Sequence, residues 1–130
     1  MSETGLLNPA SIRRIADQIG LRPTKTRGQN FVHDANTVRR IVSLAQVGAA
    51  DRVIEVGPGL GSLTLGLLET GAEVVAIEID EVLANQLPGT VAERMPGAAE
   101  RLEVVLSDAL DVKVIPLSLI HISEPTRLGM

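Results

Sequence analysis

Glycines and carboxylates recur where short apolar runs of this chain end. Gly57, Gly59 and Gly61 form a turn after the first run, and glycines let the backbone approach a ligand closely. Glu78 ends the second run, 21 residues after Gly57, close to the separation of about 20 residues at which an acidic side chain meets a ribose diol. Asp108 follows the third run, where its carboxylate could accept a hydrogen bond from an adenine amine. These residue types predict a site for a ligand that contains adenosine.

Each of these residues also has a purely structural explanation when taken alone. The glycines fit a tight turn without a ligand, Glu78 fits a helix cap and Asp108 fits an ordinary turn. Asp80 is better placed than Glu78 to cap the helix that follows. Because all three positions stand at equivalent points in the pattern, we favour the interpretation that they bind a ligand.

Glu55 helps to decide between two classes of ligand that suit such a site, dinucleotides and S-adenosylmethionine. A dinucleotide-binding turn has the pattern G-x-G-x-x-G, but Ser62 stands where its third glycine belongs. Glu55 lies two residues before Gly57, and a carboxylate there would repel a pyrophosphate but tolerate a ligand with a sulfonium and an ammonium. The residues therefore favour S-adenosylmethionine.

Strands and helices that alternate along the chain must position these residues. Apolar, β-branched runs at 52–56, 73–79 and 102–106 predict strands, and residues 62–70 predict a helix between the first two. A second helix is expected after Asp80, interrupted at Pro88-Gly89. The alternation predicts an α/β, Rossmann-like parallel sheet covered on both faces, with the ligand beyond the carboxyl ends of the strands.

The residues before this sheet predict two short helices and a loop. Asn8 and Pro9 begin an amphipathic helix that ends before Gly20, and Asp34 caps a second one that ends by Gly48. Residues 21–33 between them mix proline, glycine and cations, which predicts an irregular loop.

Composition limits the protein classes. With 130 residues the chain fits one domain, and its 45% of hydrophobic residues contain no run near the length of about 20 residues that spans a membrane. The chain has no cysteine and begins without the pattern of a signal peptide, so we expect a cytoplasmic protein without disulfides.

Charge is distributed unevenly along the chain. Residues 1–45 carry seven Arg or Lys residues against three acidic ones, a net charge of +4, which leaves −8 for the remainder. A basic segment on an acidic body suits a polyanion that touches one face. Solvated helix surfaces explain the same charges equally well.

Four motifs in order resemble those of one enzyme family. They are Gly-Gln-Asn-Phe-Val at 28–32, Glu-Val-Gly-Pro-Gly-Leu-Gly-Ser-Leu-Thr at 55–64, Ala-Ile-Glu-Ile-Asp at 76–80 and Ser-Asp-Ala-Leu at 107–110. Together they resemble the ribosomal RNA adenine N6-dimethyltransferases. The first motif is the most diagnostic, since most methyltransferases have nothing similar ahead of the first strand.

The resemblance implies S-adenosyl-L-methionine as the cofactor and roles for five residues. Asn30 and Val32 would contact it from the N-terminal segment, Gly57 would lie under its methionine end, Glu78 would bind the ribose and Asp108 the adenine. The family has Leu more often than Val at position 32, a change that matters little if the backbone makes the contact.

The resemblance also implies the reaction and the partner. The family dimethylates N6 of two adjacent adenosines in a hairpin near the 3′ end of small-subunit ribosomal RNA, by direct transfer from sulfur. Positioning of the base supplies most of the rate, so neither a metal nor a covalent nucleophile is required. We expect a monomer that acts on small-subunit RNA or the assembling subunit, with no metal, and we assign no role to His33 or His121.

The C-terminal residues depart from the family pattern. Residues 1–50 are predicted to be a helical segment with a loop that closes over the cofactor, and residues 51–111 the N-terminal part of the methyltransferase domain. The family's base-holding Asn-Leu-Pro-Tyr or Phe motif is missing from residues 112–130, part of which reads like translated adaptor DNA. We therefore expect a non-native tail and an inactive chain, with the activity in a full-length parent.

Two other functions compete with this interpretation. The basic segment fits a non-catalytic nucleic-acid-binding relative of the same fold, because fold does not fix function. A nicotinamide-dependent oxidoreductase rests on the glycine turn alone, and both Glu55 and the segment 28–32 speak against it.

Overall fold

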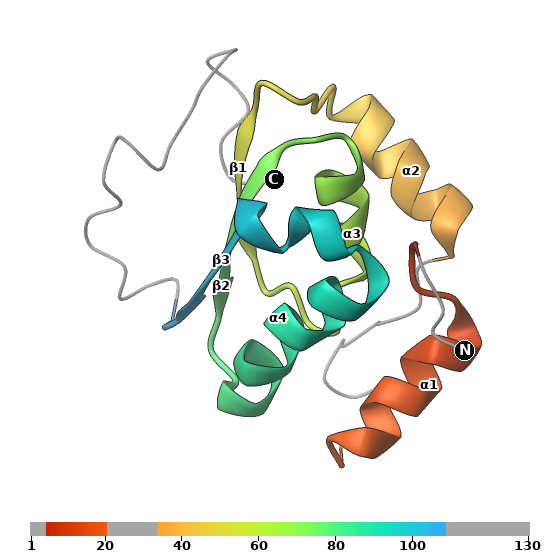
Figure 1. Ribbon diagram of the computed structural model, residues 1–130, viewed down its shortest axis with the longest axis vertical. Coiled ribbons are helices and arrows are strands. Elements are labelled where there is room, and N and C mark those ends of the chain that lie inside the picture. The colour runs from red at the N-terminus through yellow and green to blue at the C-terminus, as the bar shows by residue number, and fades with distance from the viewer. Residues whose placement is uncertain (1–4, 21–33, 109–130) are drawn as a thin grey trace.

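A computed structural model describes residues 5–20 and 34–108 (Figure 1). It confirms the predicted alternation of strands and helices, and the second strand ends one residue earlier than predicted. In chain order the elements are α1 (Pro9–Gln18), α2 (Ala35–Leu44), β1 (Arg52–Val56), α3 (Ser62–Glu69), β2 (Glu73–Glu78), α4 (Glu81–Arg94), the 3₁₀ helix η2 (Pro96–Arg101) and β3 (Leu102–Leu106).

The described strands form one parallel sheet in the order β1-β2-β3. Val53 pairs with Val74, which in turn pairs with Leu102, so the three strands begin at nearly the same level. Parallel pairing in register brings the three carboxyl ends to one edge of the sheet. That edge is where the sequence predicts the ligand.

One face of the sheet packs against the helices and forms the core. Figure 1 shows the sheet nearly edge-on, with the labelled helices on one side of it. Alternate strand residues point toward this side, including Val53, Val74 and Ala76, and they share a single buried cluster with residues of α1, α2, α3 and α4. Leu65 and Leu68 of α3 are fully buried at its centre.

The opposite face of the sheet is also apolar. Ile54, Val75 and Ile77 point to it, and none of them belongs to the core cluster. Within the described part of the chain, no helix covers this face. The sequence predicted helices on both faces of the sheet. The helices of residues 5–20 and 34–108 cover one of these faces.

The helix α4 corrects one expectation, since it runs without interruption through Pro88. A proline in a helix lacks the N–H that would donate to the preceding turn, which usually costs about 3 kcal/mol. Leu87 and Val91 on either side of Pro88 are buried in the core. Their packing holds the helix together across the missing hydrogen bond.

The N-terminal residues are tied to the sheet domain at two places. Arg94 at the end of α4 is buried and donates to the backbone oxygens of Gly5 (3.0 Å) and Leu6 (2.6 Å). The helix α2 packs on α3 where Gly66 leaves room for Val38. Both predicted N-caps are confirmed, Asn8 for α1 and Asp34 for α2.

No helix among the described residues is long and apolar enough to cross a membrane. The predicted loop at 21–33 and the predicted tail at 112–130 lie outside the described residues.

Candidate functional site

Three of the five predicted ligand-binding residues come together at the carboxyl edge of the sheet. Gly57 directly follows β1, Glu78 ends β2 and Asp108 lies two residues after the end of β3. Backbone hydrogen bonds extend the sheet through this edge, because the N–H of Gly57 donates to Ile77 O (2.8 Å) and that of Ser107 to Glu78 O (2.9 Å). The other two predicted residues, Asn30 and Val32, lie outside the described residues.

The glycine turn between β1 and α3 adopts a conformation that other residues rarely take. Gly57, Gly59 and Gly61 have φ values of +71°, +59° and +101°. A side chain at Gly61 would begin 2.7 Å from Leu87 Cδ1, whereas the space beside Gly57 is open. Gly61 thus serves packing, and exposed Gly57 leaves room for a ligand to approach the backbone.

The carboxylate of Glu78 connects the end of β2 to the glycine turn. Its Oε1 accepts from the N–H of Gly59 (3.1 Å) and its Oε2 from the N–H of Asp80 (3.0 Å). Glu78 is 4% exposed, so these two bonds fix its orientation. Each oxygen keeps a further lone pair with which it can accept a hydrogen bond from a hydroxyl.

Asp80, not Glu78, caps the helix α4, as the sequence predicts. Asp80 Oδ1 accepts from the N–H of Leu83 (3.1 Å) in the first turn of α4. The structural alternative for Glu78 as a helix cap is therefore wrong. Its carboxylate is left to organise the carboxyl edge.

Glu55 lies beneath this edge with its side chain on the core side of β1. It is 4% exposed, and its Oε1 accepts a hydrogen bond of 2.5 Å from the hydroxyl of Thr64 on α3. Burial raises the pKa of the Glu55 carboxyl to about 7, the Thr64 bond opposes this rise and the charge of Glu78 adds to it. Near neutral pH Glu55 is thus only partly ionised, so its repulsion of a pyrophosphate is weaker than the sequence suggests.

Sequence reasoning missed a group of exposed apolar side chains around the same edge. Ile79 is 67% exposed directly after Glu78, and Val82 in the first turn of α4 is half exposed. Val56 and Leu106, the last residues of β1 and β3, are also half exposed. The available signal was an apolar residue at the end of each strand or directly after it, next to the residues singled out for chemistry.

The basic character of the N-terminal segment is partly used within the protein. Arg39 of α2 forms a two-bond ion pair with Glu69 of α3, with distances of 2.9 and 2.8 Å. Arg13 and Arg40 are exposed on their helices. The Arg39 pair reduces the positive charge that α2 presents to a polyanion.

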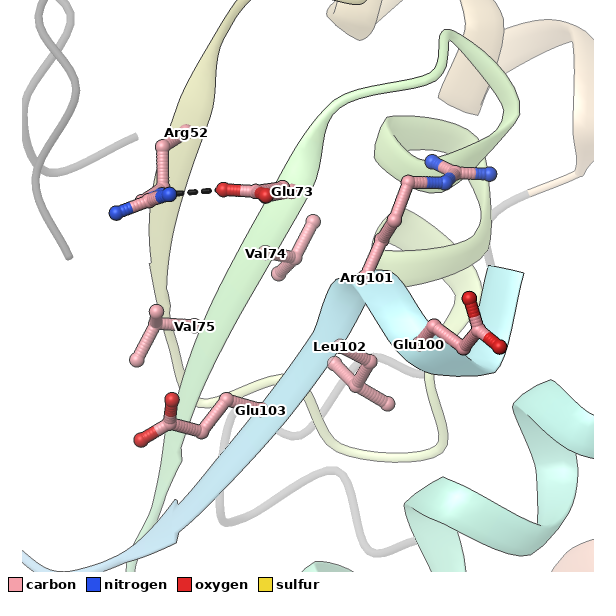
Figure 2. A pocket seen from close by; sticks show the side chains of 8 residues that line it. All are labelled: Arg52, Glu73, Val74, Val75, Glu100, Arg101, Leu102 and Glu103. Atoms are coloured by element: carbon pink, nitrogen blue, oxygen red, sulfur yellow. Dashed lines mark hydrogen bonds and ion pairs between the residues drawn. The ribbon is translucent and has the colours of Figure 1, made fainter. Parts of the chain in front are cut away.

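A separate pocket of about 320 Å³ opens at the amino ends of the strands, away from the carboxyl edge (Figure 2). Charged side chains of both signs line it, and Arg52 pairs with Glu73 across β1 and β2. Arg101 turns away to donate to Leu68 O near the end of α3 and to Ala72 O directly before β2 (both 2.8 Å). The charged side chains that line this pocket therefore serve mainly to join strands and helices.

Residues 5–20 and 34–108 contain no group of three or more His, Asp or Glu side chains placed to hold a metal ion.

Comparison with known proteins decides the family. The model of the family described as ribosomal RNA adenine dimethylase matches residues 20–127, most of the chain. The chain belongs to the ribosomal RNA adenine dimethylase family. The resemblance inferred from the four motifs is thereby confirmed.

A curated relative gives the extent of the match. The chain is 94% identical over 128 residues to the ribosomal RNA small subunit methyltransferase A of Cutibacterium acnes. This covers 98% of the chain but 41% of the relative's length. The alignment leaves out two residues of the chain and therefore includes most of the segment 112–130. The non-native origin of this segment stays a prediction.

Solved structures confirm the Rossmann-like methyltransferase fold. The 23S rRNA methyltransferase ErmE superimposes with a TM-score of 0.56 at 33% identity, over 67% of this chain and 34% of that chain. An RNA methyltransferase from Salinibacter ruber in complex with S-adenosyl-L-homocysteine gives 0.56 at 28% identity, over 62% of this chain and 52% of that chain.

Proposed function

We propose that the complete protein containing these residues dimethylates N6 of two adjacent adenosines in a hairpin near the 3′ end of small-subunit ribosomal RNA, with S-adenosyl-L-methionine as methyl donor. The observation that carries the proposal is the carboxyl edge itself. An open glycine turn, a fixed carboxylate and a second carboxylate stand on adjacent strands in a member of this family.

The residues of this edge fit the proposed cofactor. Open space beside exposed Gly57 admits the methionine end, and Glu78 presents lone pairs held in place for the ribose hydroxyls. Exposed Ile79 offers an apolar face to the adenine, and partly exposed Asp108 can accept from its amine. Asn30 and Val32 would add contacts from the N-terminal segment, as the family resemblance implies.

The bound cofactor supplies a sulfonium methyl group open to attack by an amine nitrogen. The contribution of this chain is to hold that methyl group at a fixed place beyond the sheet. Glu78 would contribute by holding the ribose, since two backbone bonds tie its carboxylate to the glycine turn and to the start of α4. Fixing one reactant in this way supplies much of the rate of a direct transfer.

The base must be held by residues beyond this edge. A target adenine has to be unstacked and gripped by hydrogen bonds and an aromatic face. The sequence lacks the family's Asn-Leu-Pro-Tyr or Phe motif, and its one aromatic residue is Phe31. We therefore infer that the 130-residue chain alone does not methylate RNA, and that a monomeric, cytoplasmic parent protein does.

A methyl-transfer assay tests this proposal. The complete protein, labelled S-adenosylmethionine and unmethylated small-subunit particles should give labelled dimethyladenosine. Asp108→Ala should raise the KM for the cofactor about 10- to 100-fold, since a hydrogen bond to a charged group contributes roughly 1.5–3 kcal/mol. Glu100→Gln, an exposed change at the amino-end pocket, should leave the KM unaltered.

Two results would contradict the proposal. One is the absence of any labelled RNA with the unaltered protein, and the other is an unchanged KM in the Asp108→Ala variant. RNA binding without methylation would instead favour the interpretation as a non-catalytic nucleic-acid-binding relative. The ion pair with Glu69 speaks against that interpretation, because it partly neutralises Arg39 of the basic segment.

A further inference from the structure

One ionisable side chain at the site has no part in the proposed function. Glu55 stands two residues before Gly57, and its side chain is buried between β1 and α3. Among the described residues, its carboxylate accepts a 2.5 Å hydrogen bond from the hydroxyl of Thr64, which is itself fully buried. A carboxyl group in such surroundings is costly to ionise unless a positive charge comes close.

Among residues 5–20 and 34–108, the charged side chains around Glu55 provide no such positive charge. From β2 it faces the carboxylate of Glu78, which adds negative charge. On α3 the acidic Glu69 pairs with Arg39. Within the described part of the chain, no ion pair includes Glu55.

The remaining charged residues of the strands are directed elsewhere. Arg52, earlier in β1, pairs with Glu73 at the amino ends of the strands. Glu103 of β3 is in register with Val75 and therefore lies on the opposite face of the sheet. Glu55 is thus a buried acid beside the ligand edge, and its described neighbours do not compensate its charge.

We propose that Glu55 is a specificity residue that releases its proton when a positively charged ligand binds, so that the site prefers the sulfonium cofactor over its thioether product. This inference rests on the proposed function. Only a proton moves, from the Glu55 carboxyl to solvent. Thr64 remains the hydrogen-bond donor to the carboxylate that is formed.

The preference follows from the charges of the two ligands. S-adenosylmethionine carries one positive charge more than S-adenosylhomocysteine, because its sulfur is a sulfonium. Burial raises the pKa of Glu55 to about 7, so near neutral pH its proton competes with the cation. The affinity for S-adenosylmethionine relative to S-adenosylhomocysteine should then rise about fivefold from pH 6 to pH 8.

Calorimetric titration of the complete protein tests the inference. Each ligand is titrated at pH 7 in two buffers of different ionisation enthalpy, which yields the number of protons released. We expect release of about half a proton with S-adenosylmethionine and clearly less with S-adenosylhomocysteine. Glu55→Gln should abolish this difference, and Glu100→Gln at the far edge should preserve it.

A second variant and the unaltered protein keep the test decisive. Thr64→Val removes the bond that lowers the pKa of Glu55, so the rise in relative affinity should move to higher pH. Equal proton release with both ligands, or the same difference in Glu55→Gln, would overturn the inference. If Glu55→Gln does not fold, a pH-independent affinity ratio in the unaltered protein overturns it.

The proposed function fails in a different way. If neither ligand binds, the proposed function falls and this inference falls with it. If both bind without any difference in proton release, only this inference falls.

Discussion

At the scale of single residues, the sequence was most informative where a residue type has few uses. Gly57, Glu78 and Asp108 were predicted to meet because each follows or ends a strand, and the structure places them at one edge. The two backbone bonds to Glu78 could not be predicted, because they depend on the exact path of the glycine turn. The exposure of Ile79 was missed because the sequence predicted this residue within a strand, where apolar residues are usually buried.

The burial of Glu55 makes a prediction about stability. Its folded-state pKa, about 7, lies above its ordinary value of 4.5, so the folded state holds the proton more tightly than the unfolded state does. The stability this supplies is complete below about pH 4.5 and is lost as pH rises through 7, a change of about 3 kcal/mol. Urea unfolding of Glu55→Gln should lack this loss, and parallel pH profiles for the variant and the unaltered protein would refute the assignment.

The glycine turn makes a second prediction at this scale. Gly61→Ala combines a φ of +101° with a Cβ 2.7 Å from Leu87 Cδ1, so we expect a loss of about 1–3 kcal/mol. Gly89→Ala in α4 is the matched control, because its Cβ meets open space in a helix and should stabilise by up to about 1 kcal/mol. Thermal unfolding measures both, and equal effects of the two substitutions would contradict the packing role of Gly61.

At the scale of elements, hydrophobic periodicity and capping residues predicted most of the fold. Strand runs were correct to within a residue, and Asn8, Asp34 and Asp80 marked three helix starts. The continuity of α4 through Pro88 was missed, because the local cost of proline is visible in the sequence and the packing of Leu87 and Val91 is not. Tertiary contacts override local preference in this helix.

Contact between two helices gives the prediction at this scale. A Cβ on Gly66 would lie 2.3 Å from Val38 Cγ1, so Gly66→Ala should force α2 away from α3 at a cost of about 1–3 kcal/mol. Val38→Ala removes the clashing methyl groups but leaves a cavity. In a double-mutant cycle the combined variant should lose less stability than the two losses added together, and simple additivity would contradict direct contact.

At the scale of the whole molecule, the described sheet looks like part of a larger one. In the common doubly wound order the first strand lies inside the sheet, with further strands beyond it. Here β1 is an edge strand although Val53 and Ile54 are buried, and the chain spans 41% of its curated relative. An apolar strand edge without a partner is also a site of aggregation.

This reasoning predicts the genetic context of the chain. Genomic DNA read past codon 111 should depart from the codons for residues 112–130 and encode Asn-Leu-Pro-Tyr or Phe within a few tens of codons, which would make these residues foreign to the native protein. A genomic stop codon directly after Met130 would instead make the tail natural, and would leave a protein without the means to hold a base.

The central claim is that the carboxyl edge of the sheet binds S-adenosylmethionine, and amide NMR of the complete protein tests it most directly. On addition of the cofactor, the amide signals of Gly57, Gly59 and Ser107 should shift, while those of Glu73 and Glu103 at the amino-end pocket should stay in place. Shifts confined to the amino-end residues, or none at either edge, would contradict the account.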